Sequence, residues 1–267
     1  MTKRRVVITG VGVVSPIGIG KEEFWNNLIA GKNGIGLITH FDTTDFACKI
    51  AAEVKDWDYT QYIDKKEGKR MDKVTQFAVT AAKLAFEDSK LDMANEDSLR
   101  AGVCVASGIG GMDTFYEQTV KYVEKGPSKV SPLFIPMEIP NMSAGQIAIA
   151  LGLQGPNTCI VTACASGTNC IGDALRTIQY GDADVMLAGG TEASISPTAV
   201  AGFGQTFHKR RLIQFRVNDE ILADAANAKF TDKTDLKNYN ITYVDGSLTV
   251  TQNPLKATSS NNEKTYD

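Results

Sequence analysis

Two kinds of hydrophobic pattern alternate along the first 205 residues of the chain. Short runs rich in valine and isoleucine predict buried strands at residues 5–14, 100–107, 157–163 and 184–190. Between them, apolar residues at three- and four-residue spacing predict helices at residues 21–30, 71–89 and 138–151, and from just after Cys164 to about Tyr180. Because strands and helices alternate, we predict an α/β layered fold with a mixed or parallel sheet.

Each of three predicted helices has an apolar face that we expect to point into the core. The expected core-facing residues are Phe24, Trp25 and Leu28 in the first helix, Val74, Phe77, Ala78, Ala81, Leu84 and Ala85 in the second, and Ile171, Ala174, Leu175 and Ile178 in the last. Gly181 follows the last helix and is expected to end it.

The pattern changes after Gln205. Residues 207–228 mix charged and apolar residues without a clean period. Residues 240–251 alternate in the manner of a strand on both sides of Asp245-Gly246, which predicts a β-hairpin. The polar residues 259–267 fit a linker or the start of another unit.

Composition changes at the same place. Of the 24 glycines, 23 lie at or before Gly204, and all five cysteines also precede it. Seven of the fourteen asparagines lie in the last 62 residues. We therefore predict two segments of different origin, residues 1–205 and residues 206–267, with a short β-rich or irregular tail as the second.

Charge and composition exclude several classes of function. A formal net charge of −3 gives no basic field for nucleic acid or an anionic membrane. No apolar run reaches the roughly 18 residues of a membrane span. The only histidines are His40 and His208, so this sequence cannot build a multi-histidine metal site. The apolar N-terminal stretch lacks a cleavage site, and five cysteines without framework spacing fit reduced thiols, so we expect a cytoplasmic protein.

Two glycine motifs follow predicted strands. Gly10-Val-Gly12 lacks the third glycine of a dinucleotide fingerprint, and Pro16 interrupts the approach to the next helix, which favours a close-packed turn. Gly108-Ile-Gly-Gly111 lacks the lysine and hydroxyl of a P-loop. The second motif therefore fits a substrate channel or a packing turn.

Cys164 is the strongest candidate for chemistry. In Thr162-Ala-Cys-Ala-Ser-Gly167, small residues surround a cysteine between a strand and a helix, as at the nucleophile turn of hydrolases. The N-terminus of a helix favours a thiolate, and its amides can hold an oxyanion. The other reading, a small buried hydrophobe, suits Cys104, Cys159 and Cys170. Neither histidine lies in a context that suggests a catalytic base for Cys164.

Six stretches closely resemble the β-ketoacyl-[acyl-carrier-protein] synthases, especially the synthase II type. They are RRVVITGVGVVSPIG (4–18), HFDTTDFACKIAAEV (40–54), SGIGGMDT (107–114), NMSAGQIAIALGLQGP (141–156), TACASG (162–167) and GDADVMLAGGTEA (181–193). The resemblance implies a thiolase-like fold, of which this chain would hold the N-terminal half of an αβαβα sandwich, and a homodimer.

The resemblance also implies an activity in fatty acid biosynthesis. Cys164 matches the nucleophile that takes an acyl chain from acyl carrier protein before a decarboxylating Claisen condensation with malonyl-carrier protein. Ile109, with Gly108 and Gly110 beside it, matches the turn that lines the acyl tunnel. A basic cluster matches the surface that receives the carrier, although taken alone it is typical of a solvated face: Lys66, Lys69 and Arg70. The resemblance implies neither a metal nor an organic cofactor.

The sequence departs from the family after Gly204. The family's second half supplies two catalytic histidines, and in their place residues 238–250 and 263–267 resemble pieces of MBG-type immunoglobulin-like repeats. We therefore expect a truncated, chimeric synthase that transfers an acyl group to Cys164 without completing condensation. The alternatives are a non-catalytic carrier-binding or surface-repeat interaction module, and a chain that folds poorly because one apolar layer is uncovered.

Overall fold

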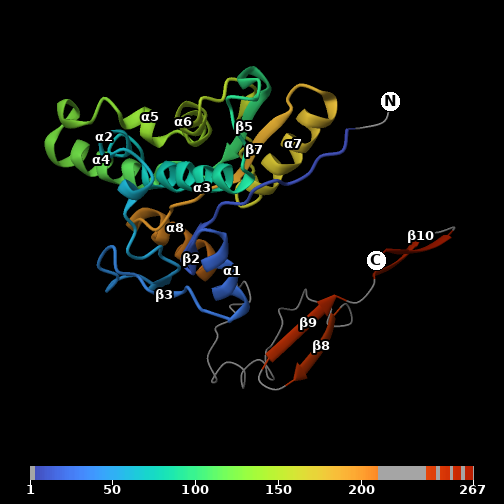
Figure 1. Ribbon diagram of the computed structural model, residues 1–267. Coiled ribbons are helices and arrows are strands. Elements are labelled where there is room, and N and C mark those ends of the chain that lie inside the picture. The colour runs from blue at the N-terminus through green and yellow to red at the C-terminus, as the bar shows by residue number, and fades with distance from the viewer. Residues whose placement is uncertain (1–3, 210–238, 245–246, 253–254, 260–261, 267) are drawn as a thin grey trace. The chain divides into compact units, whose positions relative to one another are not determined.

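The computed structural model describes residues 4–209, 239–244, 247–252, 255–259 and 262–266. The chain divides into two compact units, Met1–Thr206 and Phe207–Asp267. The helices are α1 (Lys21–Ile29), α2 (Lys65–Gly68), α3 (Lys73–Ser89), α4 (Met112–Lys125), α5 (Phe134–Glu138), α6 (Met142–Leu151), α7 (Ser166–Tyr180) and α8 (Pro197–Lys209), with single 3₁₀ turns at Tyr59–Gln61, Ser98–Arg100 and Pro127–Lys129. Figure 1 shows these elements along the chain.

A three-stranded parallel sheet lies at the centre of the first unit. Its strand order is β6 (Asn157–Thr158), β5 (Ala101–Ala106) and β7 (Val185–Gly190). The pairing of β5 with β7 ends at Ala106↔Gly190. Two short hairpins join the same unit, β1 (Val14–Ser15) with β2 (Gly18–Ile19) and β3 (Gly36–Leu37) with β4 (Ile50–Ala51).

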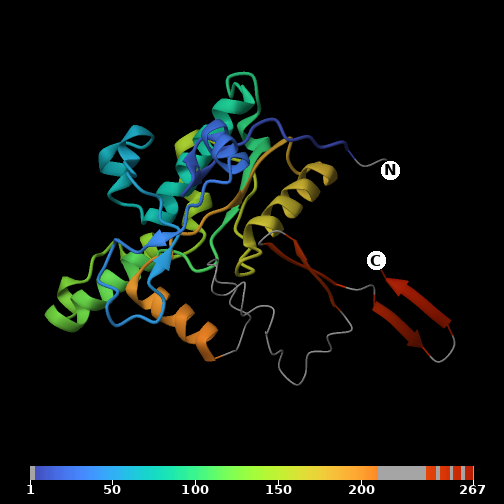
Figure 2. The same cartoon turned by 90° about the horizontal axis from the view of Figure 1, so that it is seen from below.

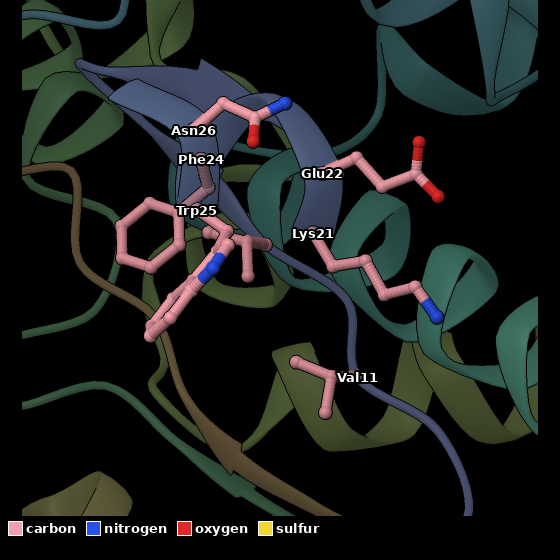
Figure 3. Close-up of a pocket in the computed structure, with 7 residues that line it drawn as sticks. Val11, Lys21, Glu22, Phe24, Trp25 and Asn26 are labelled. Carbon is pink, nitrogen blue, oxygen red and sulfur yellow. The ribbon is translucent and has the colours of Figure 1, made fainter. Parts of the chain in front are cut away.

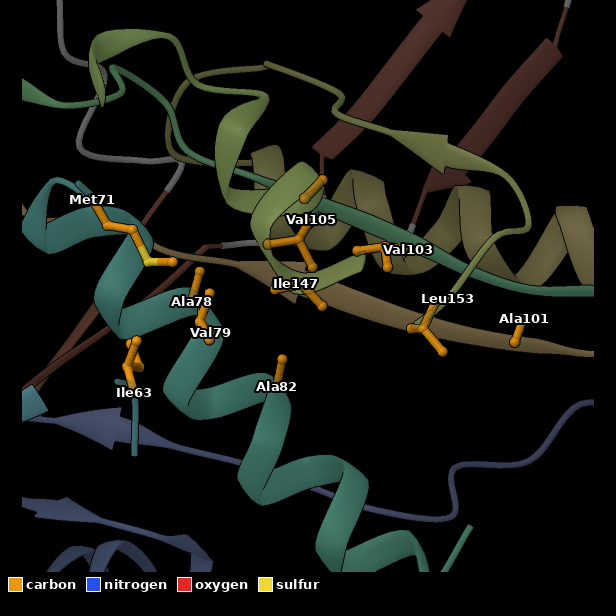
Figure 4. Close-up of a cluster of buried hydrophobic side chains, with 11 residues drawn as sticks. Ile63, Met71, Ala78, Val79, Ala82, Ala101, Val103, Val105, Ile147 and Leu153 are labelled. Atoms are coloured by element: carbon orange, nitrogen blue, oxygen red, sulfur yellow. The ribbon is translucent and has the colours of Figure 1, made fainter. Parts of the chain in front are cut away.

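Helices cover both faces of this sheet because side chains of β5 alternate between them. Val103 and Val105 pack with residues of α3 and α6, as Figure 4 shows. Cys104 and Ala106 pack on the opposite face, against α7. All six residues of β5 are buried. The predicted α/β layered fold is therefore confirmed, and Figure 2 shows α7 from a second direction.

The prediction of a strand over residues 5–14 was wrong. Only Val14 is in a strand, and in the described part of the chain no backbone hydrogen bond joins residues 5–12 to another strand. The segment instead runs along α3, so close that a Cβ on Gly10 would lie 2.2 Å from the Ala85 carbonyl oxygen. A β-branched sequence forms a strand only where a neighbouring strand takes up its hydrogen bonds.

Other predicted elements were shortened. The helix predicted over 138–151 begins only at Met142, as α6, whereas Glu138 is the last residue of the separate helix α5, and Pro140 lies between the two helices. The strand predicted over 157–163 is limited to β6, because only its first two residues pair with β5. The predictions of α3 and α7 were confirmed within two residues, and α7 ends at Gly181 with a φ of 88°.

The predicted core faces were only partly right. Ala174 of α7 is buried, and Cys170 lies beside it in the same cluster. Four residues expected to be buried are instead exposed: Trp25, Leu28, Ile171 and Leu175. Helical spacing marks an apolar face, but whether that face is covered depends on what packs against it.

An ion cluster joins the N-terminal segment to the start of β7. Arg4 Nη1 donates to Asp184 Oδ1 at 2.8 Å, and Arg100 Nη2 donates to the same oxygen at 2.9 Å. Arg100 also donates to the Gly181 carbonyl oxygen at 2.9 Å. The hydrogen bonds from Arg100, and then those from Arg4, lower the pKa of Asp184 to about 2.

Asp72 caps two helices at once. Its Oδ1 accepts the Val74 amide at 3.0 Å, which caps α3. Its Oδ2 accepts the Thr114 amide at 2.9 Å, in the first turn of α4. Because Asp72 is only 3% exposed, removal of its carboxylate leaves these two amides without a water molecule as a replacement hydrogen-bond acceptor.

Two glycines allow α7 to approach β7 closely. A Cβ on Gly190 would lie 2.7 Å from the Gly167 Cα, a distance that real side chains do not reach. The neighbouring Gly189 has no atom within 4 Å of its Cβ position. The N-terminal turn of α7 is therefore placed by the absence of a side chain at Gly190 and Gly167.

The second unit contains two antiparallel hairpins. β8 (Tyr239–Val244) pairs with β9 (Ser247–Gln252), which confirms the predicted hairpin, and its turn residues Asp245 and Gly246 lie outside the described residues. β10 (Leu255–Ser259) pairs with β11 (Asn262–Tyr266) where a linker or a new unit was expected. Most of residues 207–228 also lies outside the described residues.

We expect Asp72→Ala to lower the free energy of unfolding of the first unit by about 2–3 kcal/mol, since it removes two helix caps of about 1 kcal/mol each from a buried position. Urea unfolding followed by tryptophan fluorescence measures this unit alone, because both tryptophans, Trp25 and Trp57, lie in it. Asp97→Ala removes one cap, from an exposed 3₁₀ turn. A loss no larger for Asp72→Ala than for Asp97→Ala would contradict the double cap.

Gly190→Ala is expected to lower the free energy of unfolding by about 1–3 kcal/mol, because the added methyl group overlaps the backbone of α7. The same fluorescence measurement applies. Gly189→Ala adds the same methyl group one residue away in open space and should change the unfolding free energy by less than about 0.5 kcal/mol. Equal effects of the two substitutions would show that the contact with Gly167 is not tight.

Candidate active site

The turn that carries Cys164 is closed by hydrogen bonds from Ser166. Ser166 Oγ accepts the Thr162 amide at 2.9 Å and donates to the Ala163 carbonyl oxygen at 2.6 Å. Ala163 has a φ of 53°, in the left-handed region that non-glycine residues rarely occupy. Its side chain is small enough to limit the strain, and the result is an exposed Cys164 two residues before α7 begins.

The glycine turn at residues 108–111 lies directly beside this cysteine turn. A Cβ on Gly108 would lie 3.2 Å from the Ala163 carbonyl oxygen, so the two turns pack backbone to backbone. Gly110 has a φ of 84°, and a Cβ there would lie 2.2 Å from the Glu138 carbonyl oxygen. Ile109 between them is half-buried. The structure thus brings together the two segments that carry Cys164 and Ile109.

The basic cluster forms a separate surface. Lys66 lies in α2, and Lys69 and Arg70 follow it; all three side chains are exposed. Within residues 4–205 none of the three forms an ion pair with a carboxylate. Asp64 fixes the helix by accepting the amides of Lys66 at 2.7 Å and Glu67 at 3.2 Å. Among residues 4–205, no hydrogen bond or ion pair joins this cluster to Cys164.

The other cysteines of the sheet region have different surroundings. Cys104 and Cys170 are fully buried, and Cys159 is half-buried. Burial raises the pKa of the Cys104 thiol to about 12 and also raises that of Cys159. A thiol that stays protonated at neutral pH is a poor nucleophile. Only Cys164 combines exposure with a turn that presents its side chain.

His40 lies in a different polar environment. Its ring Nδ1 is 3.7 Å from Glu53 Oε1, and Glu53 also accepts the Thr39 amide and hydroxyl, each at 2.8 Å. Burial works to raise the pKa of Glu53, but the hydrogen bonds from Thr39 and the charge of His40 outweigh it and hold that pKa below its usual range. No contact joins His40 to Cys164, and the side chain of His208 lies outside the described residues.

A pocket beside α1 does not contain the predicted site. About 580 Å³ in volume, it lies between the N-terminal segment and α1 (Figure 3). Phe24 and Trp25 line one side of it, and Val11, Lys21 and Glu22 line the other. None of the predicted site residues lines it. Among the described residues no cluster of three metal-ligating side chains occurs, and none of the helices is both long and apolar enough to cross a bilayer.

A smaller pocket, of about 120 Å³, includes one residue that the sequence analysis missed. It is lined by His40, Lys73, Asp113 and Glu192 among others. Burial raises the pKa of Asp113, although Lys73 Nζ lies 3.4 Å away. Glu192 holds the glycine turn, since its carboxylate accepts the Gly108 amide at 2.9 Å. Its position just after a predicted strand, at the same sheet edge as Gly108, was the signal that could have found it.

Comparison with known proteins identifies the family of the first unit. A family profile described as "Beta-ketoacyl synthase, N-terminal domain" matches residues 3–212. The chain is 47% identical over 223 residues to the 3-oxoacyl-[acyl-carrier-protein] synthase 2 of Synechocystis sp., a match covering 84% of this chain and 53% of that protein. The chain spans about half the length of the curated relatives it matches.

Solved structures show the same fold. The ishigamide ketosynthase/chain length factor superposes with a TM-score of 0.69 at 31% identity, covering 77% of this chain and 51% of that one. The AntDE ketosynthase, a structure in complex with its type II polyketide synthase acyl-carrier protein, gives a TM-score of 0.67 at 23% identity, covering 78% and 56%, and supports the fold alone. The thiolase-like fold and the match over residues 3–212 together place this chain in the β-ketoacyl synthase family, of which it contains the N-terminal domain.

Proposed function

We propose that this chain is the acyl-accepting part of a 3-oxoacyl-[acyl-carrier-protein] synthase of fatty acid biosynthesis, with Cys164 as the catalytic nucleophile. The observation that carries the proposal is the exposure of Cys164 on a strained turn that packs against the Gly108 turn. The names of the curated relatives and the family match support the same reaction class. Ile109, Gly108 and Gly110 form the wall for the acyl chain.

The reaction is a thioester exchange. The Cys164 sulfur attacks the carbonyl carbon of the acyl thioester, and a new carbon–sulfur bond forms. The bond to the carrier sulfur breaks, and the proton lost by Cys164 returns to the carrier thiol. We assign stabilisation of the developing oxyanion to amides at the N-terminus of α7.

Condensation needs groups that the 267 residues do not provide. The family resemblance assigns decarboxylation of malonyl-carrier protein to two histidines of the other half of a synthase. His40 is engaged with Glu53, and no other histidine precedes His208. The 267-residue chain alone is therefore proposed to stop at the acyl-enzyme.

The partner proposed for the basic cluster is acyl carrier protein. Lys66, Lys69 and Arg70 are exposed side by side without carboxylate partners in residues 4–205, and they complement an acidic surface. A homodimer and a cytoplasmic location are proposed from the resemblance to the synthases, and the unpaired state of all five cysteines supports the latter.

We propose residues 1–205 and 206–267 as separate domains. The support is the division into compact units after Thr206 and the end of the family match at residue 212. For the tail, the antiparallel pairing of β8 with β9 and of β10 with β11 favours a β-rich unit. Its assignment to MBG-type repeats rests on the short sequence resemblance, and the comparisons do not support it.

Incubation of the purified chain with acyl-carrier protein thioester is expected to add one acyl group to Cys164, seen as a mass increase of the intact chain. Cys164→Ala should abolish the increase. Cys48→Ala removes another non-core cysteine and should leave it unchanged. Acylation that survives in Cys164→Ala would disprove the assignment of the nucleophile. Formation of 3-oxoacyl product after addition of malonyl-carrier protein would disprove the arrest at the acyl-enzyme.

Reversal of the basic cluster, by Lys66→Glu, Lys69→Glu and Arg70→Glu together, is expected to slow acylation by the carrier thioester on the order of tenfold, because charge complementarity steers the encounter. Acylation by a small acyl thioester without the carrier should not change. The matched control reverses three other exposed cations, at Arg5, Lys32 and Lys55. If carrier binding depends on the cluster while Cys164 never becomes acylated, the chain is a binding module.

A further inference from the structure

Glu192 and Ser107 leave the sheet side by side. Ser107 directly follows β5, and Glu192 comes two residues after the end of β7. Because Ala106 pairs with Gly190 in a parallel ladder, both residues emerge at the carboxyl edge of the sheet. This edge is where the glycine turn begins.

These two side chains bind every amide at the start of the glycine turn. Glu192 Oε1 accepts the Ser107 hydroxyl at 2.8 Å, and Oε2 accepts the Gly108 amide at 2.9 Å. The Ser107 oxygen in turn accepts the amides of Gly110 at 2.8 Å and Ile109 at 3.2 Å. Ser107 is fully buried, and its bond from the Gly110 amide is shielded from water, whereas Glu192 is exposed and so is its bond from the Gly108 amide.

On its other side the turn contacts mainly backbone atoms. The Gly111 amide donates to the Glu138 carbonyl oxygen at 2.8 Å, and Gly108 packs against Ala163. Among residues 4–205, the only acceptor of the Gly108 amide is Glu192 Oε2. The position of Ile109 relative to Cys164 then depends on Glu192.

We propose that Glu192, acting through Ser107, is a positioning residue that sets the acyl-chain selectivity of Cys164 by holding Ile109 in place. The proposal rests on the acyl-transfer function proposed above. Glu192 does not touch the reacting atoms, so it acts through the shape of the wall formed by the turn. The sequence resemblance assigned it no role.

The chemistry requires a carboxylate rather than an amide. Glu192 accepts a hydrogen bond at each oxygen, one from the Ser107 hydroxyl and one from the Gly108 amide. Glutamine has a single carbonyl oxygen, and its NH₂ group would face a donor at the other position. Glu192→Gln therefore conserves the shape of the side chain and removes one of its two hydrogen bonds to the turn.

Glu192 also lines the 120 Å³ pocket beside His40 and Asp113, which raises the question of a bound ligand. Both of its oxygens are already used by the turn, and Oε1 accepts a further hydrogen bond from the Ser194 hydroxyl at 3.1 Å. Its contacts therefore favour a positioning role over ligand binding.

The test measures Cys164 alkylation by iodoacetamide and by N-decyl iodoacetamide, with site occupancy read from peptide masses. In the wild-type protein, the ratio of the two alkylation rates reports how well the turn formed by Gly108, Ile109 and Gly110 accommodates the decyl chain. We expect Glu192→Gln to change this ratio at least fivefold and to speed amide hydrogen exchange of Gly108, Ile109 and Gly110 about tenfold. Ser107→Ala, which removes the acceptor of the Ile109 and Gly110 amides, should shift both in the same direction.

Ser194→Ala is the matched control, since it removes a bond to the same carboxylate without touching the turn, and it should alter the ratio less than twofold. An equal loss of rate with both reagents, or faster exchange with an unchanged ratio, would overturn the proposal. The reagents need no carrier protein. A wild type that fails to accept an acyl group would therefore count against the proposed function, while the ratio would still test Glu192.

Discussion

The parallel pairing of β5 with β7 is the constraint on which the rest of this structure depends. β5 is buried along its whole length and sends alternate side chains into the α3–α6 layer and the α7 layer. Its register with β7 brings the ends of both strands to one edge. The glycine turn, the carboxylate that binds it and the close contact of Gly167 with Gly190 all lie at this edge. A change in the register of β5 and β7 would move all of these features apart.

Local sequence predicted the elements that depend on local chemistry. β5, β7, α3 and α7 were recognisable because their hydrophobic patterns are strong and, for α7, because Gly181 ends it in a left-handed conformation. The structure of residues 5–12 was not predicted correctly, since a strand needs a neighbouring strand, and the hydrophobic pattern of one segment does not show whether that neighbour exists. The predicted burial of Ile171 and Leu175 was wrong for a similar reason. The sequence of a helix shows its apolar face, whereas the layer that covers this face is set by the tertiary structure.

The candidate site divides in the same way. Cys164 could be proposed from the small residues around it, and its exposure in the structure agrees with that reading. The contact of Gly108 with Ala163 could not be predicted from the sequence, because more than fifty residues separate them in the chain and only the fold brings them together. Its place after a predicted strand makes Glu192 a candidate, but a lone acidic residue there is usually solvated. Its donors Ser107 and Gly108 lie 85 and 84 residues away in the chain, and only the fold brings them to it.

The attachment of the N-terminal segment has a consequence for solution conditions. Since the folded-state pKa of Asp184 is about 2, the cluster with Arg4 and Arg100 stabilises the fold at any pH above the usual aspartate range and is lost only as the pH falls through that value. Yet all three partners face solvent, where dissolved ions compete for the same charges. High ionic strength, rather than mild acid, is therefore the condition that weakens the ion pairs between the N-terminal segment and the start of β7.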